Sequence, residues 1–279
     1  MWELLSLPFV QMALLTSFVL VGIYTYLGFH VVTRGVIFVD LSLAQAAAFG
    51  SIVALALGFD EHSGARYMIS LTFAMLGAGF ISVARTKDER VPQEAFIGIV
   101  YGAFIAGTIL LLSRRPEGAA ELNHILSGSL LTVQPHELVK ILSICSVVGI
   151  FHWIVRKRFF SISGDRKGAE RRGWRIWFWD LLFYASFGVV VTFSVEIAGV
   201  MLVFALLVIP PVVAVLFSNG LKSRLVIGWI VGIFATLLGV LMSLRFDLPV
   251  GSSIIAVLVG ILILSTPVLA LVTLPRNNR

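Results

Sequence analysis

Long apolar runs separated by short polar stretches make up most of this chain. Each run is close to the ~20 residues that an α-helix needs to cross the roughly 30 Å hydrocarbon core of a bilayer. The strands of a membrane barrel would instead alternate apolar and polar side chains. The pattern therefore predicts an all-α bundle in one domain, residues 1–279. The expected spans lie near 8–29, 41–59, 66–84, 94–112, 138–155, 181–197, 199–217, 225–244 and 252–273.

Two places leave the expected number of spans at eight or nine. The runs 181–197 and 199–217 are separated by a single residue, and the stretch 113–137 is irregular. Eight spans with a re-entrant piece fit the sequence as well as nine spans do. In both cases the backbone in lipid must satisfy its own hydrogen bonds, so the apolar segments are expected to be helical.

The composition supports a membrane protein and argues against several other classes. The chain is 58% hydrophobic and 13% charged, with a mean hydropathy of +0.99, whereas soluble domains carry about 25% charged residues. Its single cysteine, Cys145, cannot form an internal disulfide or a thiolate metal cluster. The sequence has no G-x-x-x-x-G-K-[ST] loop, H-E-x-x-H pair or G-x-S-x-G turn. We therefore expect neither an ATPase nor a hydrolase, and no cofactor.

The distribution of basic residues predicts the orientation of the bundle. If the loops near 30–40, 85–93, 156–180 and 218–224 and the C-terminus face the cytoplasm, they hold 16 of the 21 Lys and Arg residues. Cytoplasmic loops of membrane proteins carry such an excess. The N-terminus is then expected outside, and its first residues lack the basic region of a cleavable signal. The net charge of +6 reflects this topology, so no nucleic-acid partner is expected.

One of these loops is unusually basic. Residues 156–175 read RKRFFSISGDRKGAERRGWR and carry eight of the 21 Lys and Arg residues, opposed only by Asp165 and Glu170. A loop of this length between spans has room for a short helix that a partner can hold. Ser163 and Asp165 are residue types that cap helix N-termini, and Gly173 is suited to end a helix in the left-handed conformation. The alternative is an unstructured loop that serves only as a topology signal.

Six segments, taken in order, resemble a known family. They are RGVIFVDLSLAQAAAFG (34–50), QEAFIGIVYGAFIAGTILLLS (93–113), HILSGSLLTVQPHEL (124–138), SGDRKGAERRGW (163–174), AGVMLVFALLVIPPVVAVLF (198–217) and FDLPVGSSIIAVLVGILIL (246–264). With these segments the chain resembles the membrane permease subunit of bacterial ABC importers of the zinc, manganese and iron type. The resemblance implies the permease of an ATP-driven importer for divalent transition metal ions or metal chelates, located in the bacterial plasma (inner) membrane.

The resemblance also implies partners besides the membrane lipids. Such permeases work by alternating access as dimers, homo- or heteromeric, in which each half docks a separate ABC ATPase subunit. An extracytoplasmic solute-binding protein delivers the cargo, here over the loops 113–137 and 245–252. The ATPase would hold a coupling helix within the basic loop, 156–180. The residues assigned to this contact are Ser163, Asp165, Arg166, Gly168, Ala169, Arg172 and Gly173.

The expected translocation pathway departs from the pattern of the family. Many zinc and manganese members carry an Asp and a His four residues apart at the start of the second span, where both side chains share one helix face. With Gly50 aligned to the family glycine, these positions hold Leu41 and Gln45, and Asp40 lies one residue away. Ser42 and Gln45 form a milder polar pair, which suits either helix packing or a pathway lining. Such groups are weak Zn²⁺ ligands, which leaves a chelated metal or a hydrated cation open.

Three further residues are candidates for the pathway. Glu196 is expected near the outer end of a span, where an acid is either functional or interfacial. Glu94 stands at the cytoplasmic start of its span and serves either the pathway or the helix dipole. Pro210, followed by Pro211, predicts a kinked helix that is buried in the bundle or faces a pathway.

Two other functions have less support. A secondary transporter driven by an ion gradient needs paired charges in mid-membrane and often has internal repeats. A membrane-embedded enzyme or assembly factor needs a His, Asp and Glu constellation near one interface. The sequence shows neither pattern clearly, so the importer permease is the function predicted and the secondary transporter is the alternative.

Overall fold

The computed structural model describes residues 6–60, 63–83, 92–113 and 118–273. Some residues used in the topology prediction lie outside these ranges, namely Arg85, Lys87, Arg90, Arg114, Arg115, Arg276 and Arg279. The described elements are α2 (Pro8–Arg34), α3 (Val39–Ala56), α4 (Gly64–Val83), α5 (Gln93–Leu112), α6 (Gly118–Ser127), the 3-10 turn η1 (Leu130–Thr132), α7 (Pro135–Gly164), α8 (Arg166–Arg171), α9 (Ile176–Phe217), α10 (Leu221–Phe246) and α11 (Val250–Thr273).

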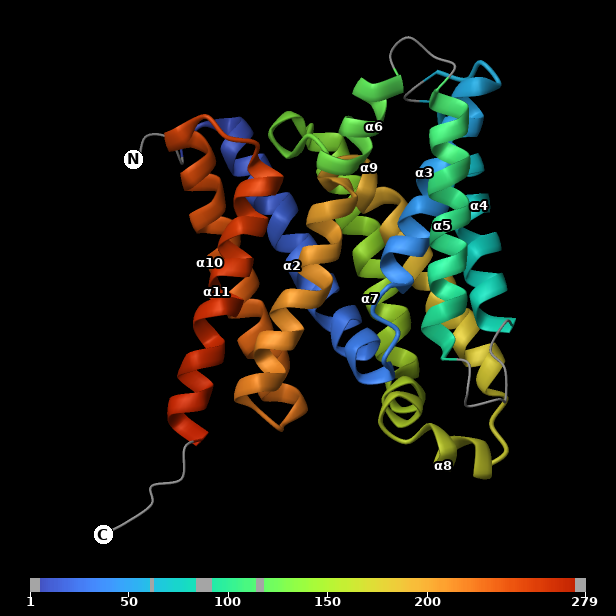
Figure 1. Cartoon of the computed structure of the whole chain (residues 1–279), viewed down its shortest axis with the longest axis vertical. Helices are drawn as coiled ribbons and strands as arrows, with labels where there is room; N and C mark the ends of the chain where they lie inside the picture. The colour runs from blue at the N-terminus through green and yellow to red at the C-terminus, as the bar shows by residue number, and fades with distance from the viewer. Residues whose placement is uncertain (1–5, 61–62, 84–91, 114–117, 274–279) are drawn as a thin grey trace.

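The predicted all-α fold is confirmed. Eight of the described helices are long and apolar enough to cross a membrane, and no described residue lies in a strand. The irregular stretch around 113–137 contains α6 and η1, both at one end of the bundle (Figure 1). This end is called the α6 end below, and the opposite end, where α8 lies, is called the α8 end.

The longest helix, α9, contains two of the predicted spans. Its 42 residues would extend about 63 Å at 1.5 Å per residue, twice the hydrocarbon thickness. Gly199 interrupts it with φ 77° and ψ 157°, a conformation that essentially only glycine adopts. Figure 1 shows the second arm of α9 running back toward the α8 end. The runs 181–197 and 199–217 are therefore two arms of one helix, and the eight long helices contain nine membrane-length segments.

Three of the loops that were predicted to face the cytoplasm lie at one end, and the loop near 85–93 and the C-terminus fall largely outside the described residues. The end of α2, the turn between α9 and α10, and α8 itself all lie at the α8 end, whereas α6 and the turn between α10 and α11 lie at the other (Figure 1). The predicted loop 156–180 needs correction. Helix α7 continues to Gly164, because Phe159 and Ile162 bury their side chains within the basic segment and extend the packed face of the helix.

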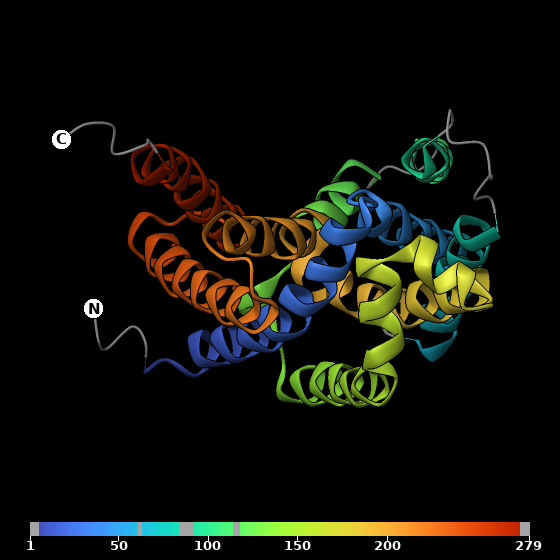
Figure 2. The same cartoon turned by 90° about the horizontal axis from the view of Figure 1, so that it is seen from below.

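Helix α2 lies in the middle of the bundle, between the α10–α11 pair and the group of α3, α4 and α5 (Figure 2). Close approach to α10 depends on two glycines: a Cβ on Gly228 would meet the Thr25 methyl at 2.5 Å, and one on Gly232 would meet Val21 at 2.6 Å. In lipid there is little hydrophobic driving force between helices, so contacts through small residues carry much of the packing. The placement of α2 matters below, because it connects the two ends.

Candidate functional site

The coupling-helix prediction falls on α8, a six-residue helix. Asp165 is its N-cap, and its Oδ1 accepts a hydrogen bond from the backbone N–H of Gly168 at 2.8 Å. This bond satisfies one of the amides that the first helical turn leaves free. The capping prediction is therefore confirmed for Asp165, whereas Ser163, the other candidate, lies in the last turn of α7.

The C-terminal end of α8 is a Schellman motif. The N–H of Trp174 donates to the carbonyl oxygen of Ala169 at 3.3 Å, and the N–H of Gly173 donates to that of Glu170 at 2.9 Å. Gly173 has a φ of 76°, the left-handed value that this motif needs and that glycine adopts without steric cost. The predicted end of the helix at Gly173 is confirmed.

Apolar contacts hold α8 against the bundle. Ala169 is fully buried and forms a small core with Ile162 of α7 and Ile176 of α9, which Trp174 and Trp179 cover. A larger residue at position 169 would push α8 away, since interiors are close-packed. The short helix is therefore docked on one side and open to a partner on the other.

Basic side chains lie over the two tryptophans next to α8. The Arg158 guanidinium lies 4.6 Å from the Trp179 ring, and that of Arg172 lies 5.2 Å from the Trp174 ring. Arg172 also donates to the Ser161 hydroxyl at 2.6 Å. Cations over aromatic faces are attracted by the ring quadrupole, so part of the basic character of this segment stabilises the docked conformation.

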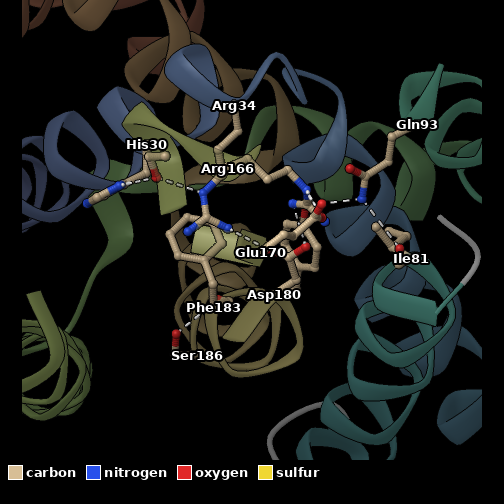
Figure 3. Close-up of polar contacts among 11 residues, drawn as sticks. His30, Arg34, Ile81, Gln93, Arg166, Glu170, Asp180, Phe183 and Ser186 are labelled. Atoms are coloured by element: carbon tan, nitrogen blue, oxygen red, sulfur yellow. Dashed lines mark hydrogen bonds and ion pairs between the residues drawn. The ribbon is translucent and has the colours of Figure 1, made fainter. Parts of the chain in front are cut away.

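A buried polar network ties α8 to the rest of the bundle (Figure 3). The Asp180 carboxylate accepts from Arg34 at 3.0 Å through one oxygen and from Arg166 at 2.9 Å through the other. The Nε of Arg34 donates to the Ser163 hydroxyl at 2.8 Å, and that hydroxyl also lies 2.9 Å from Nδ1 of His30. Helices α2, α7, α8 and α9 therefore meet in one set of hydrogen bonds.

This network is shielded from solvent. The Asp180 and Arg34 side chains are 1% and 5% exposed, and the Arg34 guanidinium lies 4.1 Å from the Phe183 ring. Buried charges are retained only where they are paired and hydrogen-bonded. All seven residues predicted to contact an ATPase lie in or beside this region, within the last turn of α7, α8 and the residues that follow it.

The polar residues of α3 lie inside the bundle. The Ser42 hydroxyl donates to the carbonyl oxygen of Ile97 in α5 at 2.7 Å, which joins α3 to α5. The Gln45 Oε1 and both Asp40 carboxylate oxygens are buried without a hydrogen-bond partner among the described residues. A buried carboxyl without a partner is costly, and the structure gives Asp40 no partner among the described residues that would offset this cost.

The remaining pathway candidates do not come together. Glu94 lies in the first turn of α5, where its Oε1 accepts from the backbone N–H of Phe38 at 3.4 Å. Pro210 is buried in the second arm of α9, and its carbonyl oxygen would lie 3.5 Å from a Cβ on Gly228 of α10. Glu196 lies near the break of α9, far along the bundle from the start of α5.

Glu196 lines a pocket of about 690 Å³ at the α6 end, here called the α6 pocket. Residues of α3, α4, α6, η1, α7 and α9 build its wall, so it collects side chains that are distant in sequence. Glu196 is exposed and forms no ion pair with a described residue. Its polar lining includes Ser51, Arg66, His124, Glu137, Lys140 and Glu196.

The two basic groups of the α6 pocket are already engaged. The Lys140 Nζ lies 4.7 Å from the Tyr67 ring centroid and 4.5 Å from that of Phe193, and these two rings lie 3.8 Å apart. Arg66 forms a 2.9 Å ion pair with Glu121. A cation over aromatic faces is weakly but specifically held. Glu196, by contrast, has no ion pair with any described residue.

The described residues contain no resident metal site. No three His, Cys, Asp or Glu side chains among them lie close enough to hold a metal ion together. The α6 pocket presents isolated carboxylate, imidazole and hydroxyl groups. These groups can attract a cation or contact a chelate but cannot enclose a bare ion in the manner of a structural zinc site.

Sequence reasoning missed the residues that join α8 to the bundle. Arg34 counted only as a topology charge, and Asp180 and His30 were assigned no role. The signal was present, because Asp180 is a lone acid inside the apolar run WFWDLLF, and ionisable residues in such runs are often functional. Lys140, one of the two basic residues of the α6 pocket, was likewise assigned no role.

A multi-pass membrane transport protein is the class that this architecture defines. Residues 6–268 match the ABC 3 transport family, and the chain belongs to this family. The resemblance drawn from the sequence is thereby confirmed: the relatives of this chain are permeases of ABC metal importers.

Two curated relatives and one solved structure illustrate the family. The manganese transport system membrane protein MntC of Listeria monocytogenes is 28% identical over 258 residues, covering 91% of this chain and 88% of that protein. The chelated iron transport system membrane protein YfeD of Yersinia pestis is 26% identical over 255 residues, covering 91% and 84%. The structure of PsaBC from Streptococcus pneumoniae in complex with Fab matches with a TM-score of 0.78 at 25% identity, covering 94% of this chain and 92% of that one.

Proposed function

We propose that this protein is the permease subunit of an ATP-driven importer for divalent transition metal ions or metal chelates in the bacterial plasma membrane. It works by alternating access as a dimer, homo- or heteromeric. A separate ABC ATPase powers it, and an extracytoplasmic solute-binding protein supplies the cargo. The observation that carries this proposal is α8, a short capped helix that is docked at the basic end of a family member's bundle.

The two ends of the bundle have different roles in this proposal. The α8 end faces the cytoplasm, because it gathers the basic loops, and it presents α8 to the ATPase. The α6 end faces outward and opens the α6 pocket to cargo that the binding protein releases. Glu196 draws a cation or a positively charged chelate into this pocket, since its carboxylate is not neutralised by a neighbouring described side chain.

The relatives support the class of cargo. The names of the curated relatives include manganese transport and chelated iron transport. The donor groups of the α6 pocket suit a hydrated cation or a chelate better than a bare zinc ion, which prefers several nitrogen, sulfur or carboxylate ligands at once. We therefore place manganese and iron, free or chelated, before zinc.

The experiment is metal uptake by the assembled importer. The chain is expressed with its ATPase and binding protein, and accumulation of Mn²⁺, Fe²⁺ and Zn²⁺ is compared with that of a variant in which residues 166–171 are a Gly-Ser linker of equal length. We expect selective uptake of one metal, and loss of both uptake and ATPase co-purification in the linker variant. The control Glu170→Gln keeps α8 and removes only the charge of a half-exposed side chain, whose 3.6 Å ion pair with Arg166 is weak at this exposure; it keeps both uptake and co-purification. Absence of uptake for free and chelated metals by the intact complex would overturn the proposal.

A further inference from the structure

The buried carboxylate of Asp180 connects the coupling helix to α2. We propose that Arg34 and Asp180 form the link that transmits the displacement of α8 by the ATPase to the central helix of the bundle, with Arg34 as a positioning residue for transport. This inference rests on the proposed function of α8 as the ATPase contact. It assigns a role to residues that lie outside α8 itself.

The geometry places one acid between two guanidinium groups. Asp180 Oδ1 lies 3.0 Å from Nη1 of Arg34, the last residue of α2, and Oδ2 lies 2.9 Å from Nη1 of Arg166, the first residue of α8. In Figure 3 both arginines point toward the carboxylate, from different helices. Guanidinium–carboxylate pairs are directional as well as strong, so a movement of Arg166 is passed to Arg34 through a defined geometry.

A second contact fixes the orientation of Arg34. Its Nε donates to the Ser163 hydroxyl at 2.8 Å, one turn before α8 begins, and its guanidinium lies over the Phe183 ring at 4.1 Å. The side chain is 5% exposed, so solvent does not screen these contacts. The end of α2 is therefore held against the end of α7 and the start of α9, the two helices that flank α8 in the chain.

Stability alone is a weak reason for such a buried pair. Removing two charges from water costs much of what their attraction returns, and an apolar replacement is often as stable. A role in registry is the better-attested use of buried ionic groups. In this bundle the ion pairs fix the position of α8 relative to the end of α2.

Helix α2 carries the displacement onward. Six residues before Arg34, Gly28 brings the α2 backbone against the second arm of α9, where a Cβ would overlap the carbonyl oxygen of Leu207 and approach Pro211 at 2.8 Å. Further along α2, Thr25 and Val21 contact glycines of α10. Close-packed contacts of this kind transmit rigid-body shifts, because they leave no void to absorb them.

The test measures metal uptake and ATP hydrolysis separately. The permease–ATPase complex with its binding protein is reconstituted in proteoliposomes, and uptake per ATP hydrolysed is compared between the natural complex and Arg34→Gln. We expect the ATPase to co-purify and hydrolyse ATP as before, while uptake per ATP falls about fivefold or more, the lower end of typical coupling energies. The matched control is Arg224→Gln, at the same end of the bundle, where the guanidinium binds only the carbonyl oxygen of Ser218 among the described groups.

Each outcome decides the question. Unchanged uptake per ATP hydrolysed in Arg34→Gln overturns the inference. A fall in uptake that is matched by loss of the co-purifying ATPase also overturns it, because Arg34 would then only anchor the ATPase contact. If the Arg34→Gln protein does not fold or insert into the membrane, Arg34→Lys is measured instead. Lysine keeps the charge but lacks the planar fork that reaches both Ser163 and Asp180. An unchanged uptake per ATP hydrolysed in Arg34→Lys also overturns the inference. Failure of the natural complex to take up metal contradicts the proposed function instead.

Discussion

Gly128 and Gly199 face each other backbone to backbone at the α6 end. Both have positive φ values, 64° and 77°. A Cβ on Gly128 would overlap the main chain at Ala198, and one on Gly199 would overlap the Gly128 nitrogen. Beside them, the Ser129 N–H donates to the carbonyl oxygen of Ile197 at 3.0 Å. The segment after α6 is therefore seated in the break of α9, and this contact forms one border of the α6 pocket.

This relationship predicts a large stability loss for Gly199→Ala. The substitution forces alanine into a backbone conformation that essentially only glycine adopts, which costs ~1–3 kcal/mol of stability. It also inserts a methyl group into filled space, which costs a further ~1–3 kcal/mol. We expect a decrease of at least about 2 kcal/mol in the free energy of unfolding, measured by thermal denaturation in detergent. The control is Gly35→Ala, where φ is 65° but nothing lies within 4 Å of a Cβ. Equal losses in the two variants would show that packing against Gly128 contributes nothing.

A second prediction concerns the contact of α2 with the proline pair of α9. Pro211 has no N–H for the carbonyl oxygen of Leu207, and the α2 backbone approaches this carbonyl at Gly28. Gly28→Ala should destabilise the protein by about 1–3 kcal/mol through overpacking. Gly22→Ala, in the same helix with open space around a Cβ, should be neutral or stabilising by up to ~1 kcal/mol. Denaturation midpoints of the two variants check this, and similar midpoints would contradict it.

Removing the free acid of the α6 pocket should weaken transport. We expect Glu196→Gln to raise the cargo concentration for half-maximal uptake by about tenfold or more, since a hydrogen bond or contact to a charged group contributes ~1.5–3 kcal/mol. The measurement is uptake against metal concentration at equal protein levels. The matched control is Glu137→Gln in the same pocket, where the carboxylate caps the Gln134 N–H at 2.8 Å and glutamine supports the same capping box. A normal concentration dependence for Glu196→Gln would remove this residue from the pathway.

Removing the positive charge of Lys140 should lower the metal concentration needed for half-maximal uptake. Its ammonium group lies over the Tyr67 and Phe193 rings within the α6 pocket and repels an incoming cation. Lys140→Met removes the charge and keeps most of the side-chain volume, so we expect tighter apparent binding of a divalent metal, by about twofold to fivefold. Lys140→Arg keeps the charge and the ring contact and serves as the control. Weaker uptake in Lys140→Met would mean that the lysine binds the cargo, as expected for an anionic chelate.

Local features of this protein were predictable because their causes are local. The caps of α8 depend on hydrogen bonds from the Gly168 N–H to the Asp165 carboxylate and from the Gly173 N–H to the Glu170 carbonyl oxygen. Both bonds join residues three positions apart. The sequence predicted a span near 138–155 followed by a loop, whereas α7 continues to Gly164. The charges of the segment 156–164 hid the apolar spacing that continues the helix. In that segment, burial of Phe159 in the tertiary fold decided the boundary.

The candidate sites were predicted less completely. The seven residues predicted to contact the ATPase lie together because they are neighbours in the chain, whereas the pathway candidates are scattered over α3, α5 and both arms of α9. Arg34 and Asp180 are separated by 146 positions, and no local pattern indicates that they pair. The roles of Asp40 and Glu196 in transport stay predictions.

The sequence by itself determined the membrane class, the nine apolar segments and the capped helix in the basic loop. Transfer free energies and short-range hydrogen bonds depend only on residues close together in the chain. Only the tertiary structure decided that Arg34 meets Asp180, that Gly128 enters the break at Gly199, and that six elements line the α6 pocket. These contacts depend on how closely distant helices approach, which small residues and side-chain shape settle over the whole bundle.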